Sequence, residues 1–124
     1  MRWALETAAA VWLAVAATAM AMAPSGDPVR GGKLYAANCG SCHSLDANRV
    51  GPAHRGVYGR KAGTARGYAY SPAMRGARIV WNETTLDRFL QNPQAMVPGT
   101  RMGFRLTDPV RRADVIAYLR QQSR

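Results

Sequence analysis

The residues with the clearest chemical potential are two cysteines and the histidine that follows them. Cys39, Cys42 and His43 form a Cys-x-x-Cys-His motif, which contains both cysteines of the chain. This spacing is typical of c-type haem attachment. Two thiols three residues apart on a helical turn can reach the two vinyl groups at one porphyrin edge, and the imidazole can bind the iron. The motif predicts one haem c, covalently held by Cys39 and Cys42, with His43 as an iron ligand.

Three other interpretations use the same residues. A thioredoxin-like motif needs a βαβ context, and no such pattern surrounds these cysteines. A zinc site could combine Cys39, Cys42, His43 and His54, although structural zinc sites usually use two closely spaced pairs, and His43 directly follows Cys42. A simple disulfide between the two cysteines is the third alternative. The haem interpretation is the strongest of the four.

A haem iron has a second axial position, and residue types alone do not choose its ligand. Met74, Met96, Met102 and His54 all stay open at this point. A lone methionine more often fills a gap in an apolar core than it binds a metal.

Two short helices are predicted on either side of a long irregular region. Asp27 followed by proline is typical of a helix start, so the first helix runs from there toward Cys39. Asn82 can cap a second helix, which ends before Pro93. The predicted apolar face of this second helix comprises Leu86, Phe89 and Leu90.

A third helix is predicted near the C-terminus. Thr107 or Asp108 caps it, and Pro109 lies near its first position. Its predicted apolar stripe comprises Val110, Ala113, Ile116 and Ala117, widened by Tyr118 and Leu119.

Long irregular segments separate these helices. Residues 46–78 are rich in Gly, Arg, Tyr and Pro and show no sustained apolar periodicity, and residues 94–106 form a second loop. Loops of this length are unusual in a small domain, and so few elements bury only a thin core. The sequence predicts an all-α domain of three or more short helices and long loops wrapped around a bulky cofactor.

The first residues differ from the rest. An Ala-rich apolar run extends from Ala8 to Ala23 and is shorter than the roughly 20 residues of a spanning helix. Small residues at 19, 21 and 23 fit a signal-peptide cleavage site. We expect a signal peptide over residues 1–21, possible cleavage as late as residue 23, and one domain over 22–124. An uncleaved anchor is the alternative. Export would place the protein in the periplasm, an oxidising compartment.

The net charge points to acidic partners. The 124 residues include 17 Lys and Arg and 7 Asp and Glu, a formal charge of +10. Such a surface steers the protein toward acidic proteins and attracts it loosely to anionic membranes. No nucleic-acid-binding motif accompanies the charge, so nucleic acid is not an expected partner.

From Asp27 onward the chain resembles the class I cytochromes c, in the mitochondrial and related bacterial soluble branch. The resemblance covers nearly all of residues 22–124. The motifs that carry it follow one another in order: Cys-x-x-Cys-His at 39–43, Gly-Pro at 51–52, Gly-Arg-Lys-x-Gly-x-Ala at 59–65, Gly-Tyr-x-Tyr at 67–70, Trp81, Leu-x-Asn-Pro at 90–93, Pro-Gly-Thr-Arg-Met at 98–102 and Ala-Asp-x-Ile-Ala-Tyr-Leu at 113–119.

The resemblance implies a role for each matching residue. Met102 matches the second axial ligand, and the carbonyl of Pro52 matches the hydrogen-bond acceptor of His43. Phe104 matches the aromatic residue at the exposed haem edge, where the basic surface includes Arg49, Arg101 and Arg105. Residues that match the groups holding the buried haem propionates are Arg60, Tyr70, Trp81 and Thr100. Packing of the first helix on the last is matched by Gly31, Tyr35 and Tyr118.

By this resemblance the protein has the small cytochrome c fold and is a monomeric electron carrier, not an enzyme. A quinol–cytochrome c oxidoreductase or a dehydrogenase is the implied donor, and a terminal oxidase or similar enzyme is the implied acceptor. The alternative is a haem enzyme or gas sensor with an open sixth iron position.

Three positions depart from the family pattern. Phe89 stands where a tyrosine is usual, and Met74 where an asparagine is usual. Both changes remove polar groups near the iron, so the charged ferric form is disfavoured and a higher reduction potential is expected. His54 stands where the family usually has leucine, and the sequence does not assign it a role.

Overall fold

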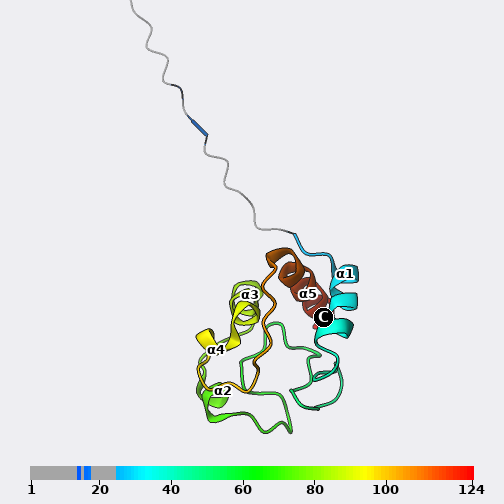
Figure 1. Ribbon diagram of the computed structural model, residues 1–124, viewed down its shortest axis with the longest axis vertical. Helices are drawn as coiled ribbons and strands as arrows, with labels where there is room; N and C mark the ends of the chain where they lie inside the picture. The colour runs from blue at the N-terminus through cyan, green and yellow to red at the C-terminus, as the bar shows by residue number, and fades with distance from the viewer. Residues whose placement is uncertain (1–13, 15, 18–24) are drawn as a thin grey trace, which may run out of the picture.

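The computed structural model describes residues 14, 16, 17 and 25–124. The elements are α1 (Pro28–Asn38), α2 (Pro72–Gly76), α3 (Glu83–Gln91), α4 (Pro93–Met96) and α5 (Pro109–Gln121). In Figure 1 helices α1, α3 and α5 lie in one half of the molecule, and long loops, with α2 among them, form the opposite end. Within the described residues, extended pairing is limited to one isolated bridge between Lys61 and Val80. The predicted all-α class is confirmed.

The predicted signal peptide and its cleavage site lie almost entirely outside the described residues, so the boundary between 21 and 22 stays a prediction. Among the helices of the described part, none is both long and apolar enough to span a bilayer.

The caps of the predicted helices agree with the sequence, with one choice resolved. The Asp27 carboxylate accepts hydrogen bonds from the first turn of α1, and Asn82 forms a reciprocal capping box with Thr85 at α3. Asp108, rather than Thr107, caps α5. Each cap is a short polar side chain that accepts N–H groups two or three residues ahead, which is a purely local interaction.

Two short helices lie in segments that were predicted to be irregular. Ser71 caps α2 and Asn92 caps α4, and each is followed by a proline at the first helical position. Both helices are too short to show an apolar period, so only the cap followed by proline could have predicted them.

Helices α1 and α5 cross in direct contact, as the resemblance implied. A Cβ added to Gly31 would lie 1.9 Å from the carbonyl oxygen of Asp114. The Asp114 carboxylate accepts hydrogen bonds from the backbone N–H of Asp27 and from the Arg30 guanidinium. Because glycine lets the two backbones touch, the N-terminal helix is fixed against the C-terminal one.

The predicted apolar stripe of α5 is partly wrong. Val110 is 50% exposed and Ala117 is partly exposed, whereas Val115 and the polar Arg112 are buried. Both α1 and α3 cover α5, so its buried surface is wider than one stripe. The Arg112 guanidinium donates to the Asp87 carboxylate at 2.7 Å and to the carbonyls of Leu106 and Thr107, which explains how a charged residue is tolerated there.

The long loops are tied to one another by side chains. The Asn48 amide accepts from the N–H of Ala53 and donates to the carbonyl of Arg66 at 3.0 Å. The Tyr68 hydroxyl donates to the carbonyl of Val50 at 2.6 Å. These bonds hold residues 48–53 against residues 66–68, so the irregular region has a defined path around the interior.

Candidate functional site

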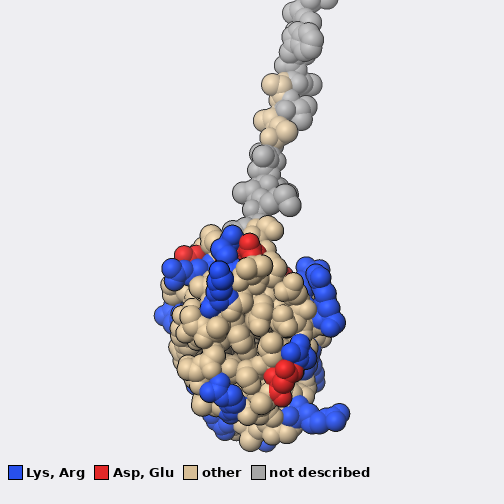
Figure 2. Space-filling model, turned by 90° about the vertical axis from the view of Figure 1, so that its right-hand side faces the viewer, with Lys and Arg blue, Asp and Glu red and all other residues tan. Residues whose placement is uncertain are grey.

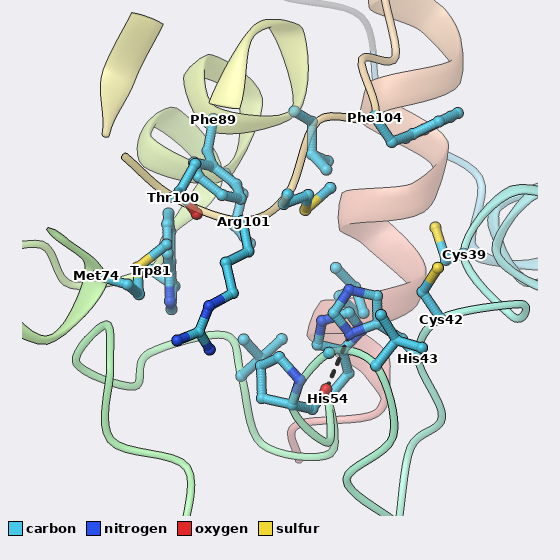
Figure 3. A pocket seen from close by; sticks show the side chains of 18 of the residues that line it. Cys39, Cys42, His43, His54, Met74, Trp81, Phe89, Thr100, Arg101 and Phe104 are labelled. Carbon is cyan, nitrogen blue, oxygen red and sulfur yellow. Dashed lines mark hydrogen bonds between the residues drawn. The ribbon is translucent and has the colours of Figure 1, made fainter. Parts of the chain in front are cut away.

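All ten residues singled out from the sequence line one cavity of about 260 Å³. Figure 3 shows side chains from several helices and loops pointing into it. The ten residues are Cys39, Cys42, His43, Pro52, Arg60, Tyr70, Trp81, Thr100, Met102 and Phe104. The first and last of them, Cys39 and Phe104, are 65 residues apart in the sequence. The fold therefore brings distant segments of the chain together at one cavity.

The two cysteines lie on the turn that follows α1. Cys39 donates its N–H to the Tyr35 carbonyl, and the N–H of His43 donates to the Cys39 carbonyl at 2.8 Å, so the turn continues the helical path. Both thiols are free, and Figure 3 shows their sulfur atoms on the same side of the cavity. Burial raises the pKa of Cys39 to about 11. Its thiol is therefore protonated at neutral pH, unlike the reactive thiolate of a redox motif.

Arg49 braces this turn, a role that the sequence did not indicate. Its guanidinium donates to the carbonyl oxygens of Gly40, Ser41 and His43. The carbonyls of a chain reversal need donors, and one planar guanidinium satisfies three of them.

The His43 ring is held for metal binding through one nitrogen. Its Nδ1 lies 2.9 Å from the carbonyl oxygen of Pro52, which accepts the ring N–H and leaves Nε2 as the metal-binding atom. A Cβ added to Gly51 would lie 2.1 Å from Cε1 of the ring, so only glycine fits there. Burial is the main cause that lowers the pKa of His43, which favours the neutral form that metals require.

His54 packs against the His43 ring, a contact that the sequence did not predict. The two ring centroids are 3.9 Å apart with an interplanar angle of 19°. Burial, and then the nearby His43 and Arg60, lower the pKa of His54 to about 3. His54 is therefore neutral at physiological pH, and it forms a flat surface behind the predicted iron ligand.

Met102 reaches the cavity from the loop after α4. The Gln94 side-chain amide donates to the carbonyl of Thr100 at 2.6 Å and to the carbonyl of Met102 at 3.1 Å. The sequence placed Gln94 at the start of the predicted loop 94–106, and no local pattern predicted its hydrogen bonds to the carbonyls of Thr100 and Met102. Gly99 turns the chain here with a positive φ of 93°.

One part of the cavity carries hydrogen-bond donors suited to carboxylates. The Tyr70 hydroxyl oxygen accepts the N–H of Ala65 at 2.9 Å, so its own proton remains to be donated. Trp81 and Thr100, whose indole N–H and hydroxyl are hydrogen-bond donors, line the same cavity. Arg60 donates to the Ala53 carbonyl and also lines the cavity. These groups match the predicted propionate-binding set in chemistry.

The remaining wall is apolar around Met74 and Phe89. Both side chains are buried and line the cavity, and the Phe89 ring packs on Trp81 with centroids 4.9 Å apart. Neither residue brings a polar side-chain group to this wall.

The donor set fits a haem better than a zinc ion. Across residues 25–124, no three His, Cys, Asp or Glu side chains are grouped so that they could hold a metal ion. Two adjacent thiols, a neutral imidazole, a thioether, apolar walls and carboxylate-binding donors instead meet the separate needs of one covalently bound haem.

Comparisons with known proteins agree with this chemistry. A model of the cytochrome c family matches residues 28–123. Cytochrome c of Euglena viridis is 48% identical over 98 residues, covering 77% of this chain and 96% of its own. Cytochrome c2 of Rhodomicrobium vannielii is 44% identical over 123 residues, covering 96% of this chain and 93% of its own.

A solved structure is also similar. Cytochrome cH from Methylobacterium extorquens has a TM-score of 0.74 and 41% sequence identity, and the match covers 77% of this chain and 99% of that one. Because the family model matches residues 28–123 and these relatives align over more than nine-tenths of their own length, this chain belongs to the cytochrome c family and is an electron carrier with one covalently bound haem c.

Proposed function

We propose that the protein is a periplasmic electron carrier between membrane-bound redox enzymes. It accepts electrons from a quinol–cytochrome c oxidoreductase or a dehydrogenase and delivers them to a terminal oxidase or a similar acceptor. The observation that carries this proposal is that His43 and Met102 line the same cavity, which lets the chain itself fill both axial positions of the iron.

The ligand set explains why transfer of an electron is favoured over catalysis. When bound, the haem supplies a one-electron Fe(III)/Fe(II) couple, and a Met/His pair raises its potential. His43, held by Pro52, and Met102, held by Gln94, would leave no position for a substrate. Phe104 lines the cavity and is 41% exposed, so the electron can pass at this edge to a docked partner. We therefore do not expect an enzymatic activity.

The surface supports docking to acidic partners. Arg49, Arg101 and Arg105 are exposed, and within residues 25–124 their guanidinium groups bond to backbone carbonyls and to no carboxylate. Their charges are thus fixed in place and uncompensated. Figure 2 shows basic side chains spread around one face, with few acidic ones between them. Encounters with acidic proteins should be fast and salt-dependent, and the monomer should also associate loosely with anionic membranes.

The proposal that the protein is exported depends on the N-terminal segment, the expected signal peptide of residues 1–21. Cytochrome c2 of Rhodomicrobium vannielii aligns over 123 residues, which extends the similarity into this segment. Mass spectrometry of protein isolated from a periplasmic fraction should give a chain that starts at Met22. A chain retaining residue 1 in the membrane fraction would instead support an uncleaved anchor.

The central test is the visible absorption of the purified holoprotein, first ferric and then reduced. We expect low-spin bands, with the weak red sulfur-to-iron band in the ferric form. High-spin bands, or a shift when carbon monoxide is added to the reduced form, would show an open iron and favour the haem enzyme or gas sensor. A protein without haem bands, made in a host that attaches haem c, would contradict both.

A further inference from the structure

The pair formed by Tyr35 and His54 is a part of the site that electron transfer alone does not explain. Tyr35 is a buried residue of α1, and His54 lies in the loop after Pro52. The Tyr35 hydroxyl and Nδ1 of His54 are 3.0 Å apart and form a hydrogen bond. The two rings meet edge to face, with centroids 5.7 Å apart. This contact connects α1 to the loop that carries the partner of the predicted iron ligand.

The His43 ring is restrained by three groups of different kinds. The Pro52 carbonyl fixes its Nδ1 edge, and the Gly51 backbone lies against the ring so closely that a Cβ would clash. The His54 ring is stacked on it, with the ring centroids 3.9 Å apart. A single hydrogen bond leaves a ring free to swing about that bond, whereas a stacked surface resists the swing.

The backbone of His54 is also fixed relative to His43. Its N–H donates to the carbonyl of Ser44, the residue next to His43, at 3.0 Å, and its carbonyl accepts the N–H of Val57. The remaining freedom of His54 is rotation of its side chain. The hydrogen bond to Tyr35 restricts that rotation, which an aliphatic side chain of similar size could not do because it has no directional contact.

We propose that Tyr35 and His54 act together as a positioning pair that sets the rotation of the His43 ring about its bond to the iron. The pair acts through the stacked His43 ring and not as an iron ligand. This proposal rests on His43 being an axial ligand, as proposed above. It assigns a role to the histidine that replaces the usual leucine.

The test is electron paramagnetic resonance of the ferric holoprotein, because the g-values of low-spin haem depend on the orientation of the axial ligand plane. Tyr35→Phe keeps the ring and removes the hydroxyl, and His54→Phe keeps an aromatic surface and removes the hydrogen bond. Both variants should shift the largest g-value in the same direction. Tyr118→Phe is the matched control, since its ring packs on Tyr35 at 5.3 Å without contacting His54 through a hydrogen bond, and it should leave the g-values unchanged.

The double variant separates a pair from two independent contacts. If the two residues act as one unit, Tyr35→Phe combined with His54→Phe shifts the g-value no further than the larger single change. Additive shifts, or wild-type g-values in both single variants, would overturn the proposal, even if the melting temperature falls. A wild-type spectrum without a low-spin signal would overturn the proposed function and this inference together. A low-spin wild-type spectrum with unshifted or additive variants would overturn only the inference, so the two failures are distinguishable.

Discussion

The two sides of the cavity are held in different ways. On the histidine side, the turn is closed by backbone bonds, braced by Arg49 at three carbonyls and backed by Pro52 and His54. On the methionine side, the backbone N–H groups of residues 101–105 make no hydrogen bond within the described part of the chain. There the carbonyls of Thr100 and Met102 depend on one side chain, that of Gln94.

This difference predicts which of the two proposed iron ligands is displaced first. Segments with few internal hydrogen bonds and exposed backbone open at lower free energy than densely bonded ones. We expect the methionine loop to be the side on which foreign ligands compete, while the histidine side keeps its geometry.

The largest expected effect comes from removing the proposed methionine ligand. Met102→Ala should abolish the red sulfur-to-iron band and let carbon monoxide bind the reduced protein. Met96→Ala is the matched control, because Met96 lies in α4 and does not line the cavity. Retention of the band in Met102→Ala, or its loss in Met96→Ala, would show that the ligand has been assigned to the wrong residue.

A second change weakens the methionine side without touching the ligand. Gln94→Ala removes both carbonyl contacts of the loop, and a typical net hydrogen-bond contribution is about 1 kcal/mol. Because the two bonds together contribute about 2 kcal/mol, imidazole should then bind the ferric protein up to roughly 30-fold more tightly, as measured by spectral titration. Gln91→Ala is the control, because Gln91 is an exposed residue of α3 whose backbone carbonyl, which accepts from Arg105, is kept. Its imidazole affinity should match that of the wild type. Equal affinities for all three proteins would mean that Gln94 does not restrain the loop.

The corresponding change on the histidine side should give a different result. Arg49→Ala leaves three carbonyls of the turn without their donor, so the midpoint of denaturant unfolding should fall. Imidazole affinity should stay near that of the wild type, because the methionine loop is intact. If Arg49→Ala and Gln94→Ala change imidazole affinity equally, the contrast between the two sides does not hold.

The apolar wall should affect the reduction potential more modestly. A Phe89→Tyr, Met74→Asn double variant returns polar groups to the cavity and should stabilise the more charged ferric form. The potential should therefore fall, on the order of tens of millivolts, in a redox titration. An equal or higher potential in the double variant would contradict this explanation.

The smallest effect concerns the helix crossing, away from the cavity. The hydrogen bond from Arg30 is the main cause that lowers the pKa of Asp114 from its ordinary value of 3.8. Below about pH 4 the unfolded chain takes up this proton before the folded one does, so the stability is present at neutral pH and is lost on acidification. Asp114→Asn should lower the stability at pH 7 and flatten its fall toward acid in denaturant titrations. An unchanged acid slope would exclude this carboxylate as its source.

Local interactions are what the sequence by itself determined. The Cys39–His43 motif and the caps at Asp27 and Asn82 depend on residues at most four positions apart, and they lie where they were predicted. Similarity to a known family then indicated the distant members of the site. All of them line the cavity, although their contacts to the haem stay predictions.

Only the tertiary structure decided how the distant segments support one another. The bonds of Gln94 to the Met102 loop, the pairing of Tyr35 with His54 and the buried Arg112 of α5 all join residues whose approach depends on the paths of long loops. The motif for haem attachment requires a fixed local spacing, and the sequence displays it directly. The restraint of each ligand requires particular partners in space, and these exist only once the chain has folded.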